Sequence, residues 1–343
     1  MTYQLTCTLI ATFLNSILIL LIQFRSPAQT GRYKYLMIFT AAFEVFWAIF
    51  DLPAEINAHS VGSAFIVFRI DYPNSWIPKH FSPMMIVVYT AIFGASMAIF
   101  ASHFTYRFGA INRDFGAKVT SGWKFGILFV VPAIYSVWWG SVVYTWFWSN
   151  PELTEYTRDL VMRSVKLDIS NVSYIGARFW NDGENGTMTW NPNAWIGVSQ
   201  MLFMVGSSMT CVFGLGSLCY FQLSTQLSVA STLDTNLQKQ LFYALVVQTA
   251  IPLILMHIPI TVYFLCPMLN MDFDFASEFM ANLITLYPAV DPLPNFFIIK
   301  SYRSALIETF NNFLSCFCRK KKLKAPANSF APSKISAVLV SAF

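Results

Sequence analysis

Several ionisable side chains lie well inside long apolar segments of this 343-residue chain, and the ones considered first are Glu44, Asp51, His257 and Asp291. A charged side chain at the centre of a lipid bilayer costs about 2.5 to 3.5 kcal/mol on insertion scales. Such residues are therefore expected to face a protein interior or a polar cavity, where they bind ligands, share protons or hold ions. The elements that position them must be membrane-spanning helices.

The composition is that of a membrane protein. Hydrophobic residues make up 56% of the chain and charged residues only 11%, against about 25% charged residues in a soluble domain. The six cysteines form no Cys-x-x-Cys pair, and the four histidines form no His-Glu-x-x-His motif. We therefore expect no enzyme, no metal site and no cofactor. The net charge of +5 follows from the loops and the tail, and it indicates no nucleic-acid partner.

Seven apolar segments each have about the 20 residues that a helix needs to cross a bilayer. They cover residues 3–24, 36–56, 83–105, 124–148, 194–222, 241–266 and 279–299. The first segment lacks the positive residues that precede the apolar run of a signal peptide, so it is interpreted as a membrane anchor. The predicted fold class is an all-α membrane protein, a seven-helix transmembrane bundle.

The distribution of lysine and arginine predicts the orientation. With the N-terminus outside, sixteen of the 22 Lys and Arg residues fall in the inner loops and the tail, and six fall in the outer loops. This bias agrees with the positive-inside rule, so the C-terminus is predicted to be cytoplasmic. The two Asn-x-Ser/Thr sequons, at Asn171 and Asn185, then share one outer loop over residues 149–193. Both are candidate N-glycosylation sites.

Residues 1–303 are predicted to form the transmembrane domain, and residues 304–324 a juxtamembrane segment. Apolar residues recur there at helical spacing and a basic run follows them, which predicts an amphipathic helix on the inner leaflet in contact with membrane lipids. Cys316 and Cys318 beside this surface are candidates for S-palmitoylation, the alternative being unmodified cysteines. Residues 325–343 are predicted to be a flexible cytoplasmic tail.

Three motifs, in chain order, carry a family resemblance. His-Phe-Thr-Tyr-Arg-Phe at 103–108, Gln-Lys-Gln-Leu at 238–241 with the later Gln248 and Pro252, and Tyr-Pro-Ala-Val-Asp-Pro-Leu at 287–293 are the stretches concerned. They resemble the third-helix ending, the entry to helix six and the seventh-helix signature of nematode seven-transmembrane chemoreceptors of the Str-related serpentine families. The resemblance covers most of the chain.

The resemblance implies a G-protein-coupled chemosensory receptor in the plasma membrane, usually in the cilium of a chemosensory neuron. Such a receptor detects a small molecule, as in olfaction, and activates a heterotrimeric G protein. Two features depart from the rhodopsin-like pattern. No cysteine lies between Cys7 and Cys211, so the disulfide from helix three to the second outer loop cannot form. Tyr106, and not an acid, precedes Arg107, so an adjacent ion pair cannot lock that arginine.

Glu44 and Asp291 are expected to form an intramembrane polar switch. Counted from the inner end, each lies roughly 12 Å deep at 1.5 Å of rise per residue. Two carboxylates at one depth predict a hydrated cluster that shares a proton or a sodium ion and rearranges when helix seven moves. The alternative is that each carboxylate only binds backbone groups that a neighbouring proline has freed.

The ligand pocket is expected in the outer third of the bundle. Asp51 and His257 lie roughly 22 to 24 Å above the inner face by the same rise, and they are its polar candidates. Tyr89, Phe93 and Tyr263 are candidate wall residues. For each of these residues the alternative is an ordinary place in the core. The aromatic-rich composition favours a small lipophilic or volatile ligand over a peptide.

Coupling to a G protein requires basic groups at the inner face, for which Arg107, Lys239 and Arg303 are the candidates. The alternative for Arg107 is a simple positive-inside anchor. Prolines within the last two spans are expected to act as hinges that let helices six and seven bend. These are Pro252, Pro259, Pro288 and Pro292.

A membrane transporter remains the alternative function, because Glu44, Asp51 and Asp291 could form a proton relay. The two halves of the chain show no inverted repeat, and seven spans do not divide evenly, which favours the receptor. The identity of the ligand, the partner G protein and the cell type cannot be read from these residues.

Overall fold

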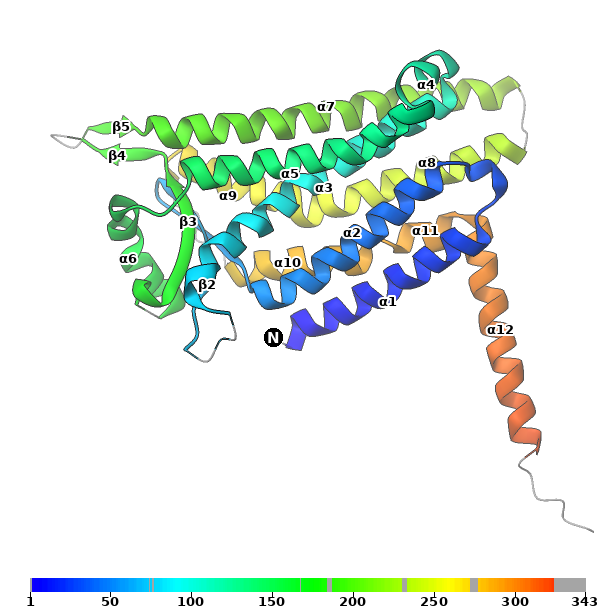
Figure 1. Cartoon of the computed structure of the whole chain (residues 1–343), viewed down its shortest axis with the longest axis horizontal. Coiled ribbons are helices and arrows are strands. Elements are labelled where there is room, and N and C mark those ends of the chain that lie inside the picture. The colour runs from blue at the N-terminus through cyan, green and yellow to red at the C-terminus, as the bar shows by residue number, and fades with distance from the viewer. Residues whose placement is uncertain are drawn as a thin grey trace, which may run out of the picture. The chain divides into compact units, whose positions relative to one another are not determined.

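The computed structural model describes residues 2–73, 75, 77–166, 168–183, 187–229, 233–271 and 277–323. The chain divides into two units, Met1–Arg303 and Ser304–Phe343. The first unit is a bundle of long helices that lie side by side (Figure 1). Asn185, the second predicted glycosylation site, lies outside the described residues, as does the tail expected to be flexible.

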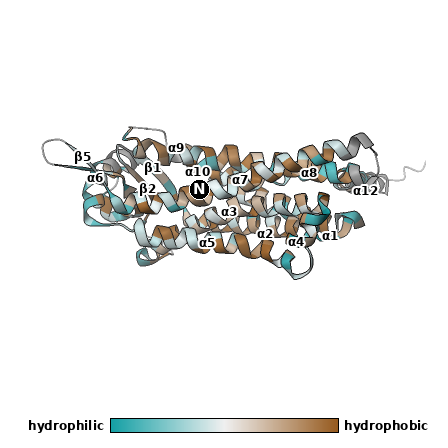
Figure 2. Cartoon of the chain, turned by 90° about the horizontal axis from the view of Figure 1, so that it is seen from above, coloured by the Kyte–Doolittle hydropathy of each residue, from teal (hydrophilic) through white to brown (hydrophobic). Residues whose placement is uncertain are grey.

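The first five spans are single helices. They are α1 (Thr2–Arg25), α2 (Tyr33–Ala54), α3 (Ser82–Ile111), α5 (Ile127–Trp146) and α7 (Pro192–Val229). Two short helices, α4 (Arg113–Val119) and α6 (Pro151–Val165), lie between them in the chain. In the part of the chain that is described, six helical segments are long and apolar enough to cross a membrane. Hydrophobic residues dominate the length of these helices in Figure 2.

The last two spans are interrupted where the sequence carries proline. The sixth consists of α8 (Leu233–Pro252), a π-helical turn (Leu253–His257) and α9 (Ile258–Met268). The seventh consists of α10 (Ser277–Val290) and α11 (Leu293–Ile298), with a turn at Asp291 and Pro292 between them. Proline lacks the N–H group of the helical ladder and its ring clashes with the preceding turn, so both helices lose regular geometry beside these residues.

One end of the bundle carries strands, and we call it the sheet end. An antiparallel sheet joins β1 (Asn57–Val61), β2 (Ala64–Ile70) and β3 (Val172–Arg178) in that order, and β4 (Trp180–Asp182) pairs with β5 (Met188–Trp190). Gly62 has a φ of 49°, as the tight loop between β1 and β2 requires. The opposite end, where α3 finishes, is the Arg107 end.

The prediction of an all-α fold was therefore wrong at the sheet end. The pairing of β2 with β3 sets Ile66 opposite Gly176 and Phe65 opposite Ala177, more than a hundred residues away in the chain. Periodicity within a short segment cannot reveal such a long-range partner. The strands order the loop over residues 149–193, which also contains α6.

Helix α3 is the central element of the bundle, since it packs against α2, α5 and α7 and is buried over most of its length. Gly94 permits the close approach of α5, because a Cβ atom at this position would lie 2.7 Å from Cβ of Trp139. No ordinary carbon contact is that short, so a larger residue would push α3 and α5 apart.

After the seventh span, α12 (Lys300–Leu323) covers residues 304–323 of the juxtamembrane segment in which a helix was predicted. Phe310, Phe313 and Leu314 are exposed on it. Its placement on the inner leaflet stays a prediction, and the side chains of Cys316 and Cys318 lie outside the described part of the chain.

The contact at Gly94 generates a stability prediction. Gly94→Ala should destabilise the protein by about 1 to 3 kcal/mol, because an overpacked interface must shift its backbone. Gly206→Ala is the matched control on α7, since nothing lies within 4 Å of the added Cβ atom. That control should leave the melting temperature unchanged or raise it slightly, because alanine favours a helix over glycine. Equal melting temperatures for the two purified variants would contradict the assigned packing.

Candidate functional site

Asp51 on α2 is a buried carboxylate that connects three helices. Its Oδ1 accepts a hydrogen bond of 3.0 Å from the Tyr89 hydroxyl of α3, and its Oδ2 accepts one of 2.8 Å from Thr285 Oγ1 of α10. The side chain of Asp51 is only 3% exposed. Both hydroxyls donate to the carboxylate, which offsets part of the cost of burying it.

Glu44 and Asp291, the predicted switch, are brought together by the fold. Both are completely buried, and their carboxyl groups lie within electrostatic range of each other. Among the described residues, neither carboxylate oxygen of Glu44 forms a conventional hydrogen bond. Asn15 of α1 lies beside Glu44 and donates from Nδ2 to the carbonyl oxygens of Ala11 and Pro288.

Amide side chains complete this cluster on the side of the sixth span. Gln248 of α8 donates from Nε2 to Oδ2 of Asp291, and its Oε1 accepts from Asn295 Nδ2 at 3.2 Å. Gln248 and Asn295 therefore tie α8 to the turn and to α11. A movement of the sixth span relative to the seventh must stretch or break this chain of hydrogen bonds.

Aromatic rings connect the two acidic positions. Trp47 lies on α2 between Glu44 and Asp51, and its ring meets Tyr89 at 5.6 Å and Tyr287 at 6.0 Å between centroids. The backbone carbonyl of Tyr287 in turn accepts a hydrogen bond of 3.0 Å from the backbone N–H of Asp291. The packing is continuous from α3 to the turn of the seventh span.

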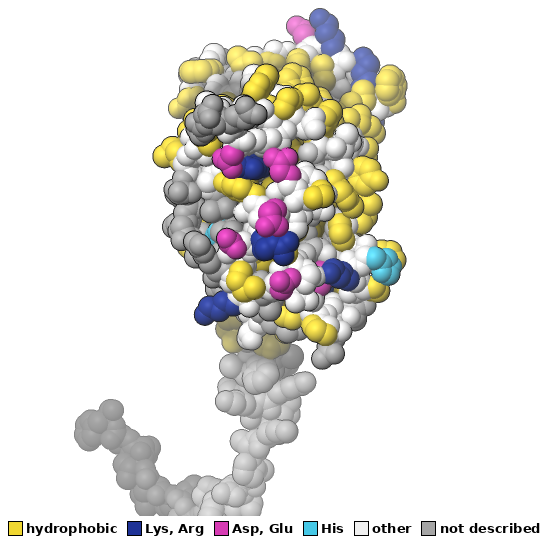
Figure 3. All heavy atoms as spheres, turned by 90° about the vertical axis from the view of Figure 1, so that its left-hand side faces the viewer, with side chains coloured by type: hydrophobic (Ala, Val, Ile, Leu, Met, Phe, Trp, Pro, Cys, Tyr) yellow, Lys and Arg dark blue, Asp and Glu magenta, His cyan; other side chains and the backbone are white. Residues whose placement is uncertain are grey.

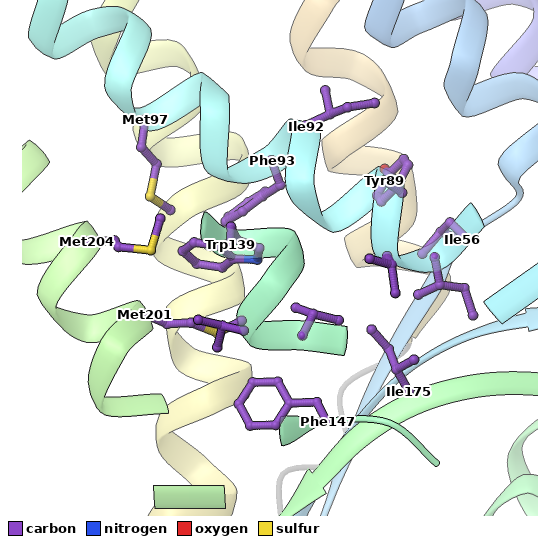
Figure 4. Close-up of a cluster of buried hydrophobic side chains, with 14 of the residues drawn as sticks. Ile56, Tyr89, Ile92, Phe93, Met97, Trp139, Phe147, Ile175, Met201 and Met204 are labelled. Atoms are coloured by element: carbon purple, nitrogen blue, oxygen red, sulfur yellow. The ribbon is translucent and has the colours of Figure 1, made fainter. Parts of the chain in front are cut away.

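An apolar cavity of about 60 Å³ lies at the sheet end, above these polar groups. Tyr89 and Phe93 line it together with residues of the sheet and of helices α5, α7, α9 and α10. Figure 4 shows the neighbouring core, to which Met97, Met201 and Met204 contribute their side chains; the ring centroids of Phe93 and Trp139 are 5.5 Å apart there. The three other residues predicted to form the ligand pocket do not line this cavity; they are Asp51, His257 and Tyr263.

His257 lies next to the cavity wall, since its ring meets Phe93 edge to face at 5.4 Å. It is 5% exposed, and neither ring nitrogen has a hydrogen-bond partner among the described residues. It ends the π-helical turn, a geometry that is frequent at functional sites. Tyr263 packs with Ala58 and Phe65, two wall residues of the cavity. Asp51 reaches the cavity through Tyr89.

The sheet covers the cavity on the side away from the Arg107 end. Charged side chains of both signs gather on this outer surface (Figure 3). Arg178 lies over the ring of Tyr156 at 4.0 Å and pairs with Asp182 at 2.7 Å and with Glu152 at 3.6 Å. Arg69, only 2% exposed, donates to Ser82 at 2.8 Å. Hydrogen bonds and ion pairs therefore hold the cover in a chain without the rhodopsin-like disulfide.

Asn171, the first predicted glycosylation site, is exposed at the start of β3. A 3-10 turn capped by Asp168 presents it. The hydrogen bond from Ser170 lowers the pKa of Asp168, so this cap remains ionised at neutral pH. The exposed Asn171 side chain is therefore sterically accessible for modification.

Arg107 at the end of α3 is held across the bundle. Its Nη1 donates to Gln238 Oε1 at 2.8 Å, its Nη2 donates to the Gln238 carbonyl at 3.3 Å, and its guanidinium lies 4.4 Å from the Tyr33 ring centre. His103 contacts the Tyr33 hydroxyl at 3.0 Å and Thr40 Oγ1 at 2.7 Å. A glutamine and an aromatic ring thus hold the arginine that lacks an adjacent acid.

The other two coupling candidates are more exposed. Lys239 lies over the Tyr243 ring at 5.8 Å, and Arg303 donates to the Phe297 carbonyl at 3.3 Å. Neither is tied to Arg107 by a described contact. Sequence reasoning missed Asn15, Thr285 and Asn295, although polar residues within apolar spans were a signal that could have found them.

The chain matches the family of serpentine-type seven-transmembrane G-protein-coupled chemoreceptors named Str over residues 1–307. G-protein coupled receptor str-217 of Caenorhabditis elegans is 35% identical over 313 residues, which cover 90% of this chain and 89% of that protein. Serpentine receptor class r-10 of Caenorhabditis briggsae is 28% identical and covers 91% and 88%.

Squid rhodopsin superposes with a TM-score of 0.57 at 14% identity, over 98% of this chain and 87% of that one, which shows a shared fold. The span pattern, the third-helix and seventh-helix motifs and the family match agree. The chain is a multi-pass membrane receptor, not an enzyme, and it belongs to the Str family of serpentine G-protein-coupled chemoreceptors.

Proposed function

We propose that this receptor binds a small lipophilic or volatile molecule in the cavity at the sheet end and activates a heterotrimeric G protein at the Arg107 end. The sheet end faces outward and the C-terminus is cytoplasmic, in the ciliary membrane of a chemosensory neuron. The lysine and arginine bias supports this orientation. The exposed Asn171 sequon at the sheet end agrees with it.

The observation that carries the proposal is the apolar cavity under the sheet with a polar connection at its base. Tyr89 lines the cavity and donates to Asp51, which also accepts from Thr285 of the seventh span. A ligand that displaces Tyr89 therefore changes a contact that holds the second, third and seventh spans together. Ligand binding in this one cavity can therefore change the packing of α2, α3 and α10.

The lining supports the ligand class. Ile56, Val143, Met201 and Ile284 are typical wall residues, and Asn57 is one of few polar groups. The volume of about 60 Å³ is small against the roughly 300 to 1,000 Å³ of drug-sized pockets. The ligand must therefore be small or must push side chains aside, for which flexible methionines such as Met201 are suited.

His257 connects the cavity to the sixth span, because it contacts Phe93 of the cavity wall and belongs to the π-helical turn of that span. Its ring packs against Phe93, and its two nitrogens have no hydrogen-bond partner among the described residues, so a ligand that moves Phe93 opens access to a polar group. His257 is the last residue of the π-helical turn, which lies between Pro252 and Pro259. A contact there can change the bend of the helix whose other end carries Gln238 and Lys239.

The switch lies between these two ends. Two carboxylates in a low-dielectric interior repel each other unless a proton or a cation lies between them. We infer that Glu44 and Asp291 share a proton or a sodium ion in the resting receptor. The seventh span bends at Pro288 and Pro292, next to Asp291, so a change in the shared charge alters that bend.

At the Arg107 end, the resting state is closed by Arg107 and Gln238, which link the third and sixth spans. Opening this link frees Arg107 for a G protein, with Lys239 and Arg303 as further basic contacts. The palmitoylated and amphipathic tail of the proposed receptor would lie on the inner leaflet. A transporter is disfavoured, because the relatives are receptors.

The cavity assignment can be tested once a panel of odorants has given an agonist. Phe93→Ala and His257→Ala should each weaken agonist potency by about ten-fold, or roughly 1.4 kcal/mol, because the wall and its polar neighbour are lost. Phe203→Ala removes an exposed ring of α7 and should leave potency unchanged. The readout is G-protein activation at matched surface expression. Unaltered potency in both cavity variants would refute the assignment.

The shared charge predicts an unusual stabilisation. Glu44→Gln should raise the melting temperature of the purified receptor in sodium-free buffer, because it removes a buried repulsion. It should also abolish the dependence of that temperature on sodium concentration or pH. Glu155→Gln, an exposed carboxylate paired with Arg158, should change neither quantity. If the parent receptor and Glu44→Gln respond alike to sodium and to pH, no charge is shared.

The link at the Arg107 end predicts a change in basal activity. Gln238→Ala should raise ligand-independent G-protein activation by about ten-fold, because a hydrogen bond to a charged group contributes roughly 1.5 to 3 kcal/mol. Asn236→Ala changes an exposed amide two residues earlier on α8 and should leave basal activity at the parent level. A fall in basal activity for Gln238→Ala would mean that this contact belongs to the active state.

A further inference from the structure

A second cavity, of about 490 Å³, lies toward the Arg107 end and outside the proposed signalling path. Helices α3, α5 and α7 and the segment around α4 line it, and we call it the α5 groove. Its volume falls within the roughly 300 to 1,000 Å³ of small-molecule sites. Its lining residues differ from those of the cavity at the sheet end.

The mouth of the α5 groove is basic. Lys118 and Lys124 both line it, and Lys124 Nζ donates to the Lys118 carbonyl at 2.8 Å. No carboxylate is among the lining residues, and neither lysine forms an ion pair in the described ranges. Each ammonium group has three donors, so capacity remains for an anionic ligand. Trp123, 79% exposed, also lines the groove, and exposed tryptophans are enriched at the headgroup region of membranes.

The interior of the groove is apolar. Ala98, Ala101, Leu128 and Val131 form its walls. Most hydroxyl groups of the lining already have partners: Tyr135 and Ser207 hydrogen-bond each other at 2.8 Å, Ser208 donates to the Met97 carbonyl at 2.7 Å, and Thr105 donates to the Ala101 carbonyl at 2.8 Å. Apart from the Ser102 hydroxyl, the groove therefore offers an occupant mainly hydrocarbon surface.

The groove is also long in the direction of the α5 axis. Its lining residues on α5 run from Ile127 to Tyr135, eight residues or about 12 Å at 1.5 Å per residue, and Lys124 lies in the turn just before this helix. Ile127, 43% exposed, lies on the open side. An occupant with a negative head at the lysines and an extended apolar chain toward Tyr135 fits this arrangement.

We propose that the α5 groove is a binding site for an anionic phospholipid. The phosphate and the acidic headgroup bind Lys118 and Lys124, and one acyl chain lies against Ala98, Ala101 and Val131. The assignment to the cytoplasmic leaflet rests on the orientation in the proposed function, whereas the binding chemistry does not. The occupied groove would brace α4 and α5 against α3, close to Arg107.

The test uses the full-length receptor purified in detergent, with no odorant and no G protein. Native mass spectrometry compares the retention of phosphatidylserine and phosphatidylcholine. The parent receptor should retain phosphatidylserine about ten-fold better, and Lys118→Gln with Lys124→Gln should remove this preference. Ile127→Trp should lower the retention of both lipids by filling the groove. Thermal melting confirms that each variant is folded.

Arg113→Gln is the matched control, because it removes the same charge from α4 at a residue outside the groove. It should leave retention unchanged. Equal retention of the two lipids by the parent receptor, or an equal loss in Arg113→Gln, would overturn the inference. So would equally strong competition by glycerophosphoserine, which carries the headgroup without chains. A receptor that signals normally but shows no preference refutes this site alone and leaves the proposed function standing.

Discussion

The burial of three carboxylates in an apolar bundle is the constraint on which the rest of this structure depends. Asp51 is stabilised by the hydroxyls of Tyr89 and Thr285, while Glu44 and Asp291 lie together with only part of their hydrogen-bonding capacity satisfied. Burying a charge without a full set of partners is costly. The bundle therefore holds a region whose free energy depends strongly on small shifts of helix position, and this is the property that a conformational switch requires.

The breaks in the sixth and seventh spans lie next to that region. The turn at Asp291 frees backbone groups that a continuous helix would consume, and the amide side chains of Gln248 and Asn295 join the broken seventh span to the sixth. The π-helical turn brings His257 against Phe93. Irregular backbone is tolerated at membrane depth only where protein or polar groups surround it. The irregular backbone therefore needs the polar surroundings that the buried acids and amides supply, and the acids lie where regular helix geometry is interrupted.

Much of this was accessible from the sequence. The seven spans followed from their length and hydropathy, the shared depth of Glu44 and Asp291 followed from the rise of a helix, and the prolines marked the positions where regular geometry ends. The sheet was not accessible, because Ile66 and Gly176 belong to segments that have no local signal for each other. Which polar residue meets which acid was not accessible either: Asn15, Thr285 and Asn295 lie on helices whose rotation about their own axes only packing fixes.

The sequence by itself therefore determined the family and the mostly helical, membrane-spanning class of the fold, because these follow from composition, motifs and the length of the apolar segments. The tertiary structure alone decided which side chains meet. It placed Tyr89 and Phe93 in the cavity wall and His257 behind it. It also set Gln238 against Arg107 where a neighbouring acid is missing. The physical reason is that the length and apolar character of a span are properties of one helix, whereas contact depends on how several helices rotate and tilt against one another.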